Sequence, residues 1–180
     1  DENRVVLHLG DRLIVDGEII QLEEFRSNNV YQAAEKISTP TNPLTDEESR
    51  GILDVVKLLN WEMPASGPLL AGWCVLSQVC ALLKWRPHAW LNGGSGSGKT
   101  TVSERFVQAL VGDMALVTAL ETSAAGFRQE MKSDGLPVII DEFDPKKQSD
   151  QTNAQGFFNL MRLASNESNV KIIKGSASGE

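Results

Sequence analysis

The feature that most constrains this chain is a glycine-rich run between an apolar segment and an amphipathic one. Residues 93–100 read GGSGSGKT and match the pattern G-x-x-x-x-G-K-[ST] in full. The preceding residues His88–Leu91 predict a short strand, and Thr100–Val111 predict a helix. Glycines let the backbone turn so tightly that several N–H groups point at one anion, and a helix N-terminus adds positive potential there. The run therefore predicts a phosphate-binding loop rather than a flexible linker.

The side chains that end this run suit a nucleotide with Mg²⁺. We expect Lys99 to reach the β- and γ-phosphates and the Thr100 hydroxyl to ligate Mg²⁺. Resemblance to other P-loops implies that Thr101 touches the α-phosphate. The predicted nucleotide-binding residues are Gly93, Gly94, Ser95, Gly96, Ser97, Gly98, Lys99, Thr100 and Thr101.

An apolar strand that ends in acid is the second part expected of a site that hydrolyses a nucleotide. Pro137–Asp141 predicts such a strand, and Glu142 follows it. We expect Asp141 to hold Mg²⁺ through water and Glu142 to orient and polarise the attacking water. Alone, the pair is better explained as solvated carboxylates at a strand end. Together with the loop it favours hydrolysis, with Glu142 and Lys99 as catalytic residues.

Strands and helices alternate from about residue 86. This alternation predicts an α/β domain with a mainly parallel sheet. Together with the glycine-rich motif, it leads us to expect a P-loop NTPase core. The further strands are expected at 114–120, 137–141 and 170–173, and the further helices at 123–132 and 153–164.

The earlier part of the chain follows other patterns. Three β-prone runs within residues 5–22, separated by Gly10-Asp11 and Asp16-Gly17, predict a small β meander. A weak helix is expected near 28–37 and a linker at 38–43. A helical pair is expected around 46–84, with Ser66 as a cap of its second helix. The expected organisation is a β-rich segment 1–40, a helical segment 44–85 and the NTPase core 86–180.

Charge and apolar content limit the partners of the chain. The formal net charge of −7 over 180 residues argues against coating duplex nucleic acid by charge alone. The longest apolar stretch, 69–83, is shorter than a membrane span needs, so we expect no membrane contact. The two cysteines, Cys74 and Cys80, are expected to be free thiols in a reducing cytoplasm.

Several segments together resemble the ATPase region of bacteriophage and mobile-element primase–helicase proteins. The acidic pair at 141–142 is similar to that of additional-glutamate ATPases such as AAA+ proteins and superfamily 3 helicases. The segments that carry the resemblance are HLGDRLIVDG (8–17), WRPHAWLNG (85–93), ETSAAGFRQ (121–129), LPVIIDEFD (136–144), RLAS (162–165) and IKGSASG (173–179).

This resemblance implies Mg²⁺-dependent binding and hydrolysis of ATP in the motor module of a DNA helicase or primase–helicase. It also implies a homo-oligomeric ring. Because the family has a sensor-1 strand, a sensor-2 arginine and an arginine finger after this point, we expect the chain to be a fragment. The alternative hypotheses are a nucleotide-gated interaction module without motor activity and a P-loop kinase of a small molecule.

Other candidates have simpler explanations beside the functional ones. Thr122 or Ser123 is a sensor candidate, although helix capping is favoured, and Arg128 and Arg162 are candidate phosphate or inter-subunit contacts, although solvated positions are favoured. A basic hairpin that grips DNA and a merely solvated hairpin remain about equally favoured at 171–174. The remaining candidates are Lys171 and Lys174 for DNA, His8 and His88 as structural residues, and Trp61, Trp73, Trp85 and Trp90 as packing between the helical pair and the sheet.

Overall fold

The computed structural model describes residues 4–38, 42–119, 122, 124–131, 135–141 and 148–165. The chain divides into two compact units, Asp1–Asp46 and Glu47–Glu180. It is a mixed α/β protein with a three-stranded antiparallel sheet in the first unit and a two-stranded parallel sheet in the second.

The first unit is the expected β meander. Its strands are β1 (Val6–His8), β2 (Arg12–Val15) and β3 (Glu18–Gln21). Asp16 and Gly17, between β2 and β3, have φ values of 53° and 90°. Positive φ at both central residues defines the tight hairpin turn that suits the twist of paired strands, so the Asp-Gly prediction is confirmed.

The prediction of a helix near 28–37 is wrong. The N–H of Ala34 donates to the carbonyl of Gly10 at 2.9 Å, and the N–H of Ile37 donates to the carbonyl of Leu9 at 3.0 Å. These donors are therefore used across the unit rather than along a helix. The segment instead covers the meander, in which Leu9 and Leu13 are fully buried.

Helices make up most of the second unit. The expected helical pair is present as α1 (Asp46–Lys57) and α2 (Ser66–Ser77), followed by the short 3-10 helix η1 (Cys80–Leu82). Ser66 is not a cap, because α2 is preceded by Ala65 and has no side-chain cap hydrogen bond. The helix after the glycine-rich loop runs without a break as α3 (Lys99–Val102), the π-helical η2 (Ser103–Val107) and α4 (Gln108–Val111), ending in η3 (Gly112–Met114).

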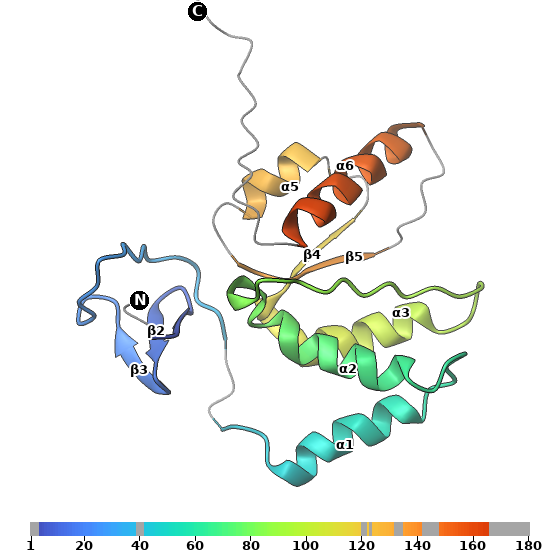
Figure 1. The fold of residues 1–180 in the computed structure, drawn as a ribbon, viewed down its shortest axis with the longest axis horizontal. Coiled ribbons are helices and arrows are strands. Elements are labelled where there is room, and N and C mark those ends of the chain that lie inside the picture. The colour runs from blue at the N-terminus through green and yellow to red at the C-terminus, as the bar shows by residue number, and fades with distance from the viewer. Residues whose placement is uncertain are drawn as a thin grey trace, which may run out of the picture. The chain divides into compact units, whose positions relative to one another are not determined.

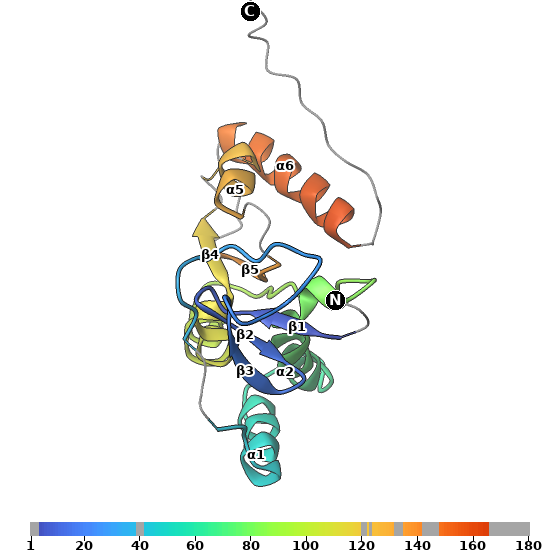
Figure 2. The ribbon, with the colours of Figure 1, turned by 90° about the vertical axis from the view of Figure 1, so that its left-hand side faces the viewer.

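The parallel sheet separates two helical layers. Strand β4 (Leu116–Ala119) pairs with β5 (Val138–Asp141), with Leu116 opposite Val138 and Ala119 opposite Asp141. In Figures 1 and 2, α5 (Ala124–Met131) and α6 (Gln148–Ala164) lie on one side of these strands. Helices α1, α2 and α3 lie on the other side.

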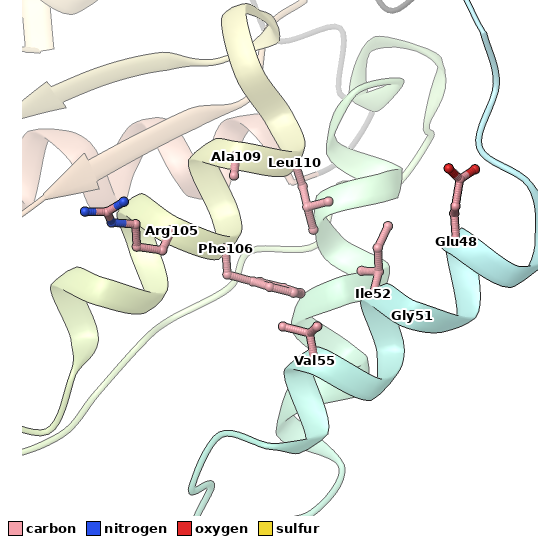
Figure 3. Close-up of a pocket in the computed structure, with 8 residues that line it drawn as sticks. All are labelled: Glu48, Gly51, Ile52, Val55, Arg105, Phe106, Ala109 and Leu110. Atoms are coloured by element: carbon pink, nitrogen blue, oxygen red, sulfur yellow. The ribbon is translucent and has the colours of Figure 1, made fainter.

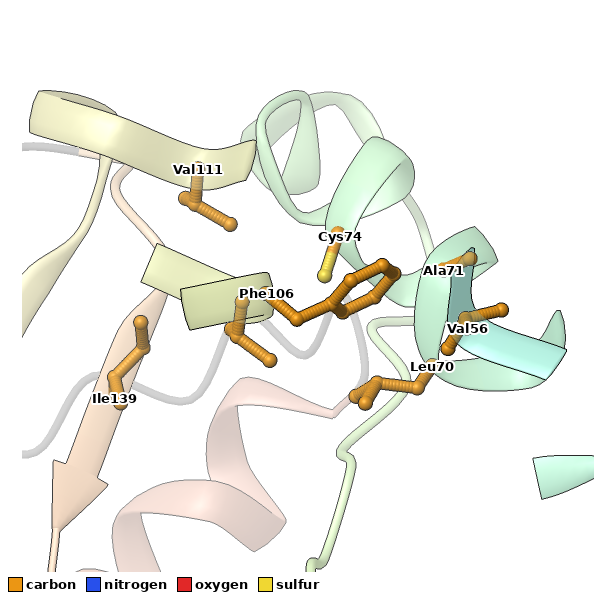
Figure 4. Packing of buried hydrophobic residues seen from close by; sticks show 8 residues of the cluster. Val56, Leu70, Ala71, Cys74, Phe106, Val111 and Ile139 are labelled. Carbon is orange, nitrogen blue, oxygen red and sulfur yellow. The ribbon is translucent and has the colours of Figure 1, made fainter. Parts of the chain in front are cut away.

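The main core joins the helical pair, the helix 99–111 and β5. Figure 4 shows this cluster, in which Phe106 lies between residues of α2 and the sheet. Its buried members are Val56, Leu70, Ala71, Cys74, Phe106, Val107, Val111 and Ile139. A separate small cluster, Ala154 and Phe157 with Phe127, Ile140 and Leu160 packed against it, holds α5 and α6 on the opposite face. Each face of β5 thus has its own apolar contact.

The strand expected at 88–91 is not formed. The backbone N–H of Arg86 donates to the Ser165 carbonyl at 2.9 Å, and Leu91 packs against the main core. The hydrogen bonds of Arg86 and His88 run to the end of α6 and to Ser165 after it, and residues 88–91 belong to no strand. The expected strand 170–173 lies outside the described residues.

The tryptophan prediction holds for two of the four residues. Trp61 and Trp73 pack against the main core. Trp85 and Trp90 are 64% and 55% exposed, so the prediction that they pack between the helices and the sheet is wrong. Among the described residues, no helix is both long and apolar enough to cross a membrane.

Candidate functional site

The glycine-rich loop is mostly exposed and contains two glycines with a left-handed backbone conformation. Gly96 and Gly98 have φ values of 75° and 85°, a region that L-residues with a side chain rarely adopt. A Cβ atom added at either position would meet nothing within 4 Å. The backbone favours glycine here and, apart from the adjacent residues, no atom of the described residues lies within 4 Å of these two Cβ positions. Backbone N–H groups in such a glycine-rich turn are suited to an anion.

The side chain of Lys99 folds back onto the backbone of this loop. Its Nζ donates to the carbonyls of Gly93 at 2.6 Å and Gly94 at 2.9 Å. An ammonium group has three donors, so these bonds leave one for a ligand. The charge is thereby fixed beside the loop backbone although the side chain is exposed.

The start of the loop is held by a residue that the sequence did not single out. The Oδ1 of Asn92 accepts the N–H of Gly93 at 2.9 Å, and the N–H of Ser97 donates to the Gly94 carbonyl at 3.3 Å. A side chain added at Gly93 would come within 2.5 Å of Ser97 Oγ. The position of Asn92 directly before the first glycine is the sequence feature from which this contact could have been predicted.

The helix that follows adds a second source of positive potential. Gly98 precedes it, and the first bond that closes it joins the N–H of Val102 to the Gly98 carbonyl at 2.9 Å. The first N–H groups of a helix have no carbonyl acceptor within the helix. The N–H groups of Lys99, Thr100 and Thr101 are in this position, at the end of a helix continuous to Val111.

Asp141 shares a sheet face with this helix. Ile139 of β5 is buried in the same cluster as Val107 and Val111, whereas Ile140 packs against the α6 cluster. Side chains two residues apart on a strand point to the same face. Asp141, half-buried at the last residue of β5, therefore points to the side of the sheet on which the loop and its helix lie.

The direction of the helix brings its N-terminus toward the end of β5. In Figure 1 the helix 99–111 runs opposite to β5, and the β5 arrow points toward the side where the glycine-rich loop turns into α3. Asp141 lies about 7 Å beyond Ile139 along the strand. It thus lies at the end of the strand that points toward the N-terminal side of this helix.

Several other predicted site residues lie outside the described residues. These are Glu142, Ser123, Lys171 and Lys174. Thr122 is described, and its Oγ1 shares a hydrogen bond of 2.9 Å with Thr118 Oγ1. Its N–H donates to the Ala119 carbonyl at 3.1 Å.

The other titratable residues of the described part of the chain form no second cluster of metal ligands or nucleophiles. Arg128 is half-buried on α5 and Arg162 is exposed on α6. Burial raises the pKa of the Cys74 thiol to about 11 and also raises that of Cys80, so neither is a ready thiolate nucleophile. No group of three or more metal-ligating His, Cys, Asp or Glu side chains occurs in the described part of the chain.

An apolar groove of about 340 Å³ runs between α1 and the helix 99–111 (Figure 3). Ile52, Val55 and Phe106 form its floor and sides, with Glu48 and Arg105 at its ends. None of the predicted nucleotide-binding residues lines it. The groove is thus distinct from the loop.

The structure brings the loop, its lysine and the helix start together, and it puts Asp141 on the same side of the sheet. His88 Nε2 lies 3.1 Å from the Met161 carbonyl and 2.9 Å from Ser165 Oγ, and the structural role expected of His88 stays a prediction. Comparison with protein-family models, with curated proteins and with solved structures finds no match for this chain.

Proposed function

We propose that this chain binds ATP with Mg²⁺ and hydrolyses it, as a P-loop NTPase core. The observation that carries the proposal is the exposed glycine-rich loop at the start of a helix. Lys99 Nζ is held beside this loop by hydrogen bonds of 2.6 and 2.9 Å to the carbonyls of Gly93 and Gly94. Exposed backbone N–H groups, an ammonium and a helix N-terminus all favour a triphosphate. No other arrangement of the described residues gathers three such contributions.

Mg²⁺ fits the donors that this arrangement offers. A hydroxyl at Thr100 and a carboxylate at Asp141 are hard oxygen ligands, and Mg²⁺ prefers few protein ligands together with phosphates and water. Thr100 would hold the ion directly and Asp141 through water. When bound, the ion would neutralise charge on the phosphates.

The chain's own residues have separate tasks in this proposal. The loop N–H groups and Lys99 bind and orient the phosphates, while Glu142 positions and polarises the attacking water. Lys99 also counters the charge that develops on the transferred phosphoryl group.

The test compares binding of a fluorescent ATP analogue to wild type and Lys99→Ala, with Mg²⁺ and with EDTA. Removing the ammonium should raise Kd roughly tenfold to a hundredfold, because hydrogen bonds to charged groups contribute about 1.5–3 kcal/mol. Lys84→Ala is the matched control, since Lys84 is also exposed but lies outside the loop. Absence of binding by wild type at millimolar ATP and Mg²⁺ would overturn the proposal.

Hydrolysis is tested separately with Glu142→Gln. This variant should keep nucleotide affinity and lose turnover, because an amide cannot take a proton from water. Turnover equal to that of an active wild type would remove Glu142 from its assigned role. Tight binding without turnover in wild type would favour the nucleotide-gated interaction module, and a product formed only with an acceptor would favour the kinase.

We further propose that hydrolysis drives a ring-forming motor on DNA. This part is supported by the resemblance of segments 85–93, 121–129 and 136–144 to primase–helicase ATPases. Single-stranded DNA should then stimulate turnover. Turnover that is indifferent to DNA would limit the proposal to an ATPase.

A further inference from the structure

Helix α2 is apolar on the side that faces solvent as well as on the side that faces the core. Its sequence, SGPLLAGWCVLS, contains no charged residue. On the core side Leu70, Ala71 and Cys74 are buried, and Figure 4 shows them around Phe106. A helix that is apolar on all sides is normally covered on all sides. Within the described part of the chain only one side of α2 is buried, so the other side is a candidate interface.

We call this second side of α2 the outer face. It consists of Leu69, Gly72, Val75 and Leu76, with Val79 directly after the end of the helix. Leu69 and Val75 are 71% and 67% exposed, and Leu76 is 45% exposed. Positions 69, 72, 76 and 79 are three or four residues apart, which is the spacing of the apolar seam between two packed helices. The outer face is therefore shaped to receive another helix.

The outer face has a hole and a matching projection. Gly72 is exposed, and a Cβ atom added there would meet nothing within 4 Å. Glycine lowers the stability of a helix interior, but it lets a large side chain approach the helix backbone closely. Leu76 lies one turn later on the same face and is the large side chain nearest in sequence to this hole on its C-terminal side. The two positions are thus complementary in size.

We propose that the outer face binds the outer face of a second copy of this chain, with the two α2 helices antiparallel. A two-fold axis between Gly72 and Leu76 puts Leu76 of each copy against Gly72 of the other. The same axis puts Leu69 of each copy against Val79 of the other. Each copy thereby fills the hole of its partner, and this self-complementarity is the reason for choosing a second copy as the occupant.

The charges around α2 support the same choice. A buried charge without a partner is costly, so the occupant has to present a face without charge, and α2 itself presents one. A lipid surface fits less well, because helices that lie on membranes carry many cations. Residues 58–83 contain one acid, Glu62, and no Lys or Arg. A two-fold contact closes with two copies, so it is distinct from the head-to-tail contacts of a ring.

Sedimentation of the full chain without nucleotide tests the proposal. Wild type should be a dimer at submillimolar concentration and dissociate in the micromolar range, because one short helix from each copy makes a small interface. Leu76→Glu should raise the dimer Kd about a hundredfold or more, since the two-fold buries an unpaired carboxylate twice. Val55→Glu is the matched control and should dimerise as wild type does. Val55 is similarly exposed but lines the groove between α1 and the helix 99–111.

A second variant tests the fit between the hole and the projection. Gly72→Leu should fold at least as well as wild type, because leucine favours a helix more than glycine does and the space is open. It makes the outer face more apolar, yet it should raise the dimer Kd about tenfold, because it fills the hole. Combining Gly72→Leu with Leu76→Ala exchanges the two sizes and should restore the dimer to within a few-fold of wild type. Tighter association of Gly72→Leu would indicate unspecific apolar contact and would overturn the proposal.

The remaining outcomes also decide the proposal. A dimer that Leu76→Glu leaves unchanged would use another surface, and this would overturn it. So would a wild type that is monomeric at submillimolar concentration. Flotation of that monomer with phosphatidylcholine vesicles would then assign the outer face to a lipid surface, and failure to float would assign it to a different protein. Lys99→Ala should dimerise as wild type does, so failure of this inference is distinguishable from failure of nucleotide binding at the loop.

Discussion

Two glycine-dependent loops, one in each unit, use glycine for opposite purposes. At Gly10, with a φ of 84°, a Cβ atom would overlap the carbonyl oxygen of Glu35. At Gly96 and Gly98, with similar φ values, a Cβ atom would meet nothing within 4 Å. The first loop is covered by its own chain, whereas the second leaves its backbone uncovered.

The difference shows what each loop can do. Around Gly10 the polar backbone groups are used internally, since its carbonyl accepts the N–H of Ala34. In the loop at 93–98, Gly96 and Gly98 adopt left-handed φ values and, apart from the adjacent residues, no described atom lies within 4 Å of the position that a Cβ atom would take at either residue. Glycines at positive φ without a covering contact from the described residues favour a binding role for the second loop.

The largest expected effect is at Gly10. Gly10→Ala should destabilise the first unit by about 3 kcal/mol or more, because the added methyl group meets backbone and the residue keeps a left-handed φ. Amide hydrogen exchange at Ala34 and Ile37 measures this directly, since both N–H groups bond across that loop. Unchanged protection of these two amides would show that the close approach at Gly10 is not a constraint.

The next effect is expected at Gly98. Gly98→Val should cost about 2 kcal/mol if the left-handed conformation is kept, because a β-branched residue is strained there. We expect the loop to change conformation instead and nucleotide affinity to fall by about tenfold or more. The measurement is Kd for the fluorescent ATP analogue, together with urea unfolding followed by tryptophan fluorescence.

Gly112 supplies a matched control for this variant. It has a φ of 56°, a Cβ atom there would meet nothing within 4 Å, and it follows the far end of the same helix. Gly112→Val should lower the free energy of unfolding as Gly98→Val does but leave nucleotide affinity unchanged. Equal losses of affinity in the two variants would attribute the effect to helix stability rather than to the loop.

A smaller effect is expected at Gly93. Gly93→Ala places a methyl group 2.5 Å from Ser97 Oγ and 3.2 Å from Ser97 Cβ. Relieving this overlap should cost about 1 kcal/mol and weaken nucleotide binding several-fold. Adding Ser97→Gly removes both contacting atoms, so the double variant should bind as Ser97→Gly alone does. If the double variant binds nucleotide as weakly as Gly93→Ala does, the overlap with Ser97 is not the cause of the lost affinity.

Features set by neighbouring residues were predictable from the sequence. The Asp16-Gly17 turn and the helices α1, α2 and α5 follow from turn chemistry and periodicity, and all are confirmed. The parallel pairing of β4 with β5 is a longer-range feature that the alternation of strands and helices predicted, and it is also confirmed. The conformation of the glycine-rich loop is of the same kind, since its glycines and lysine interact within eight residues. The nucleotide and metal roles assigned to it stay predictions.

Features set by distant contacts were not predictable. The segment before the loop has the composition of a strand, but its backbone and side chains bond to α6 rather than to β4 or β5. The segment 28–37 has helical composition, but two of its N–H groups bond to carbonyls at positions 9 and 10. For the same reason Trp90 was expected to be buried, whereas it pairs on the surface with a residue of α6.

The smallest expected effect is at Gly94, and it separates backbone conformation from open space. Gly94 lies in the loop with an ordinary φ, and a Cβ atom there would meet nothing within 4 Å. Gly94→Ala should therefore change the free energy of unfolding by no more than about 0.5 kcal/mol. If nucleotide affinity is also unchanged while Gly98→Val loses it, the left-handed backbone is what the ligand requires. If Gly94→Ala keeps its stability and loses affinity, the methyl group occupies the place of the anion, and the unfilled space above the loop is itself the binding site.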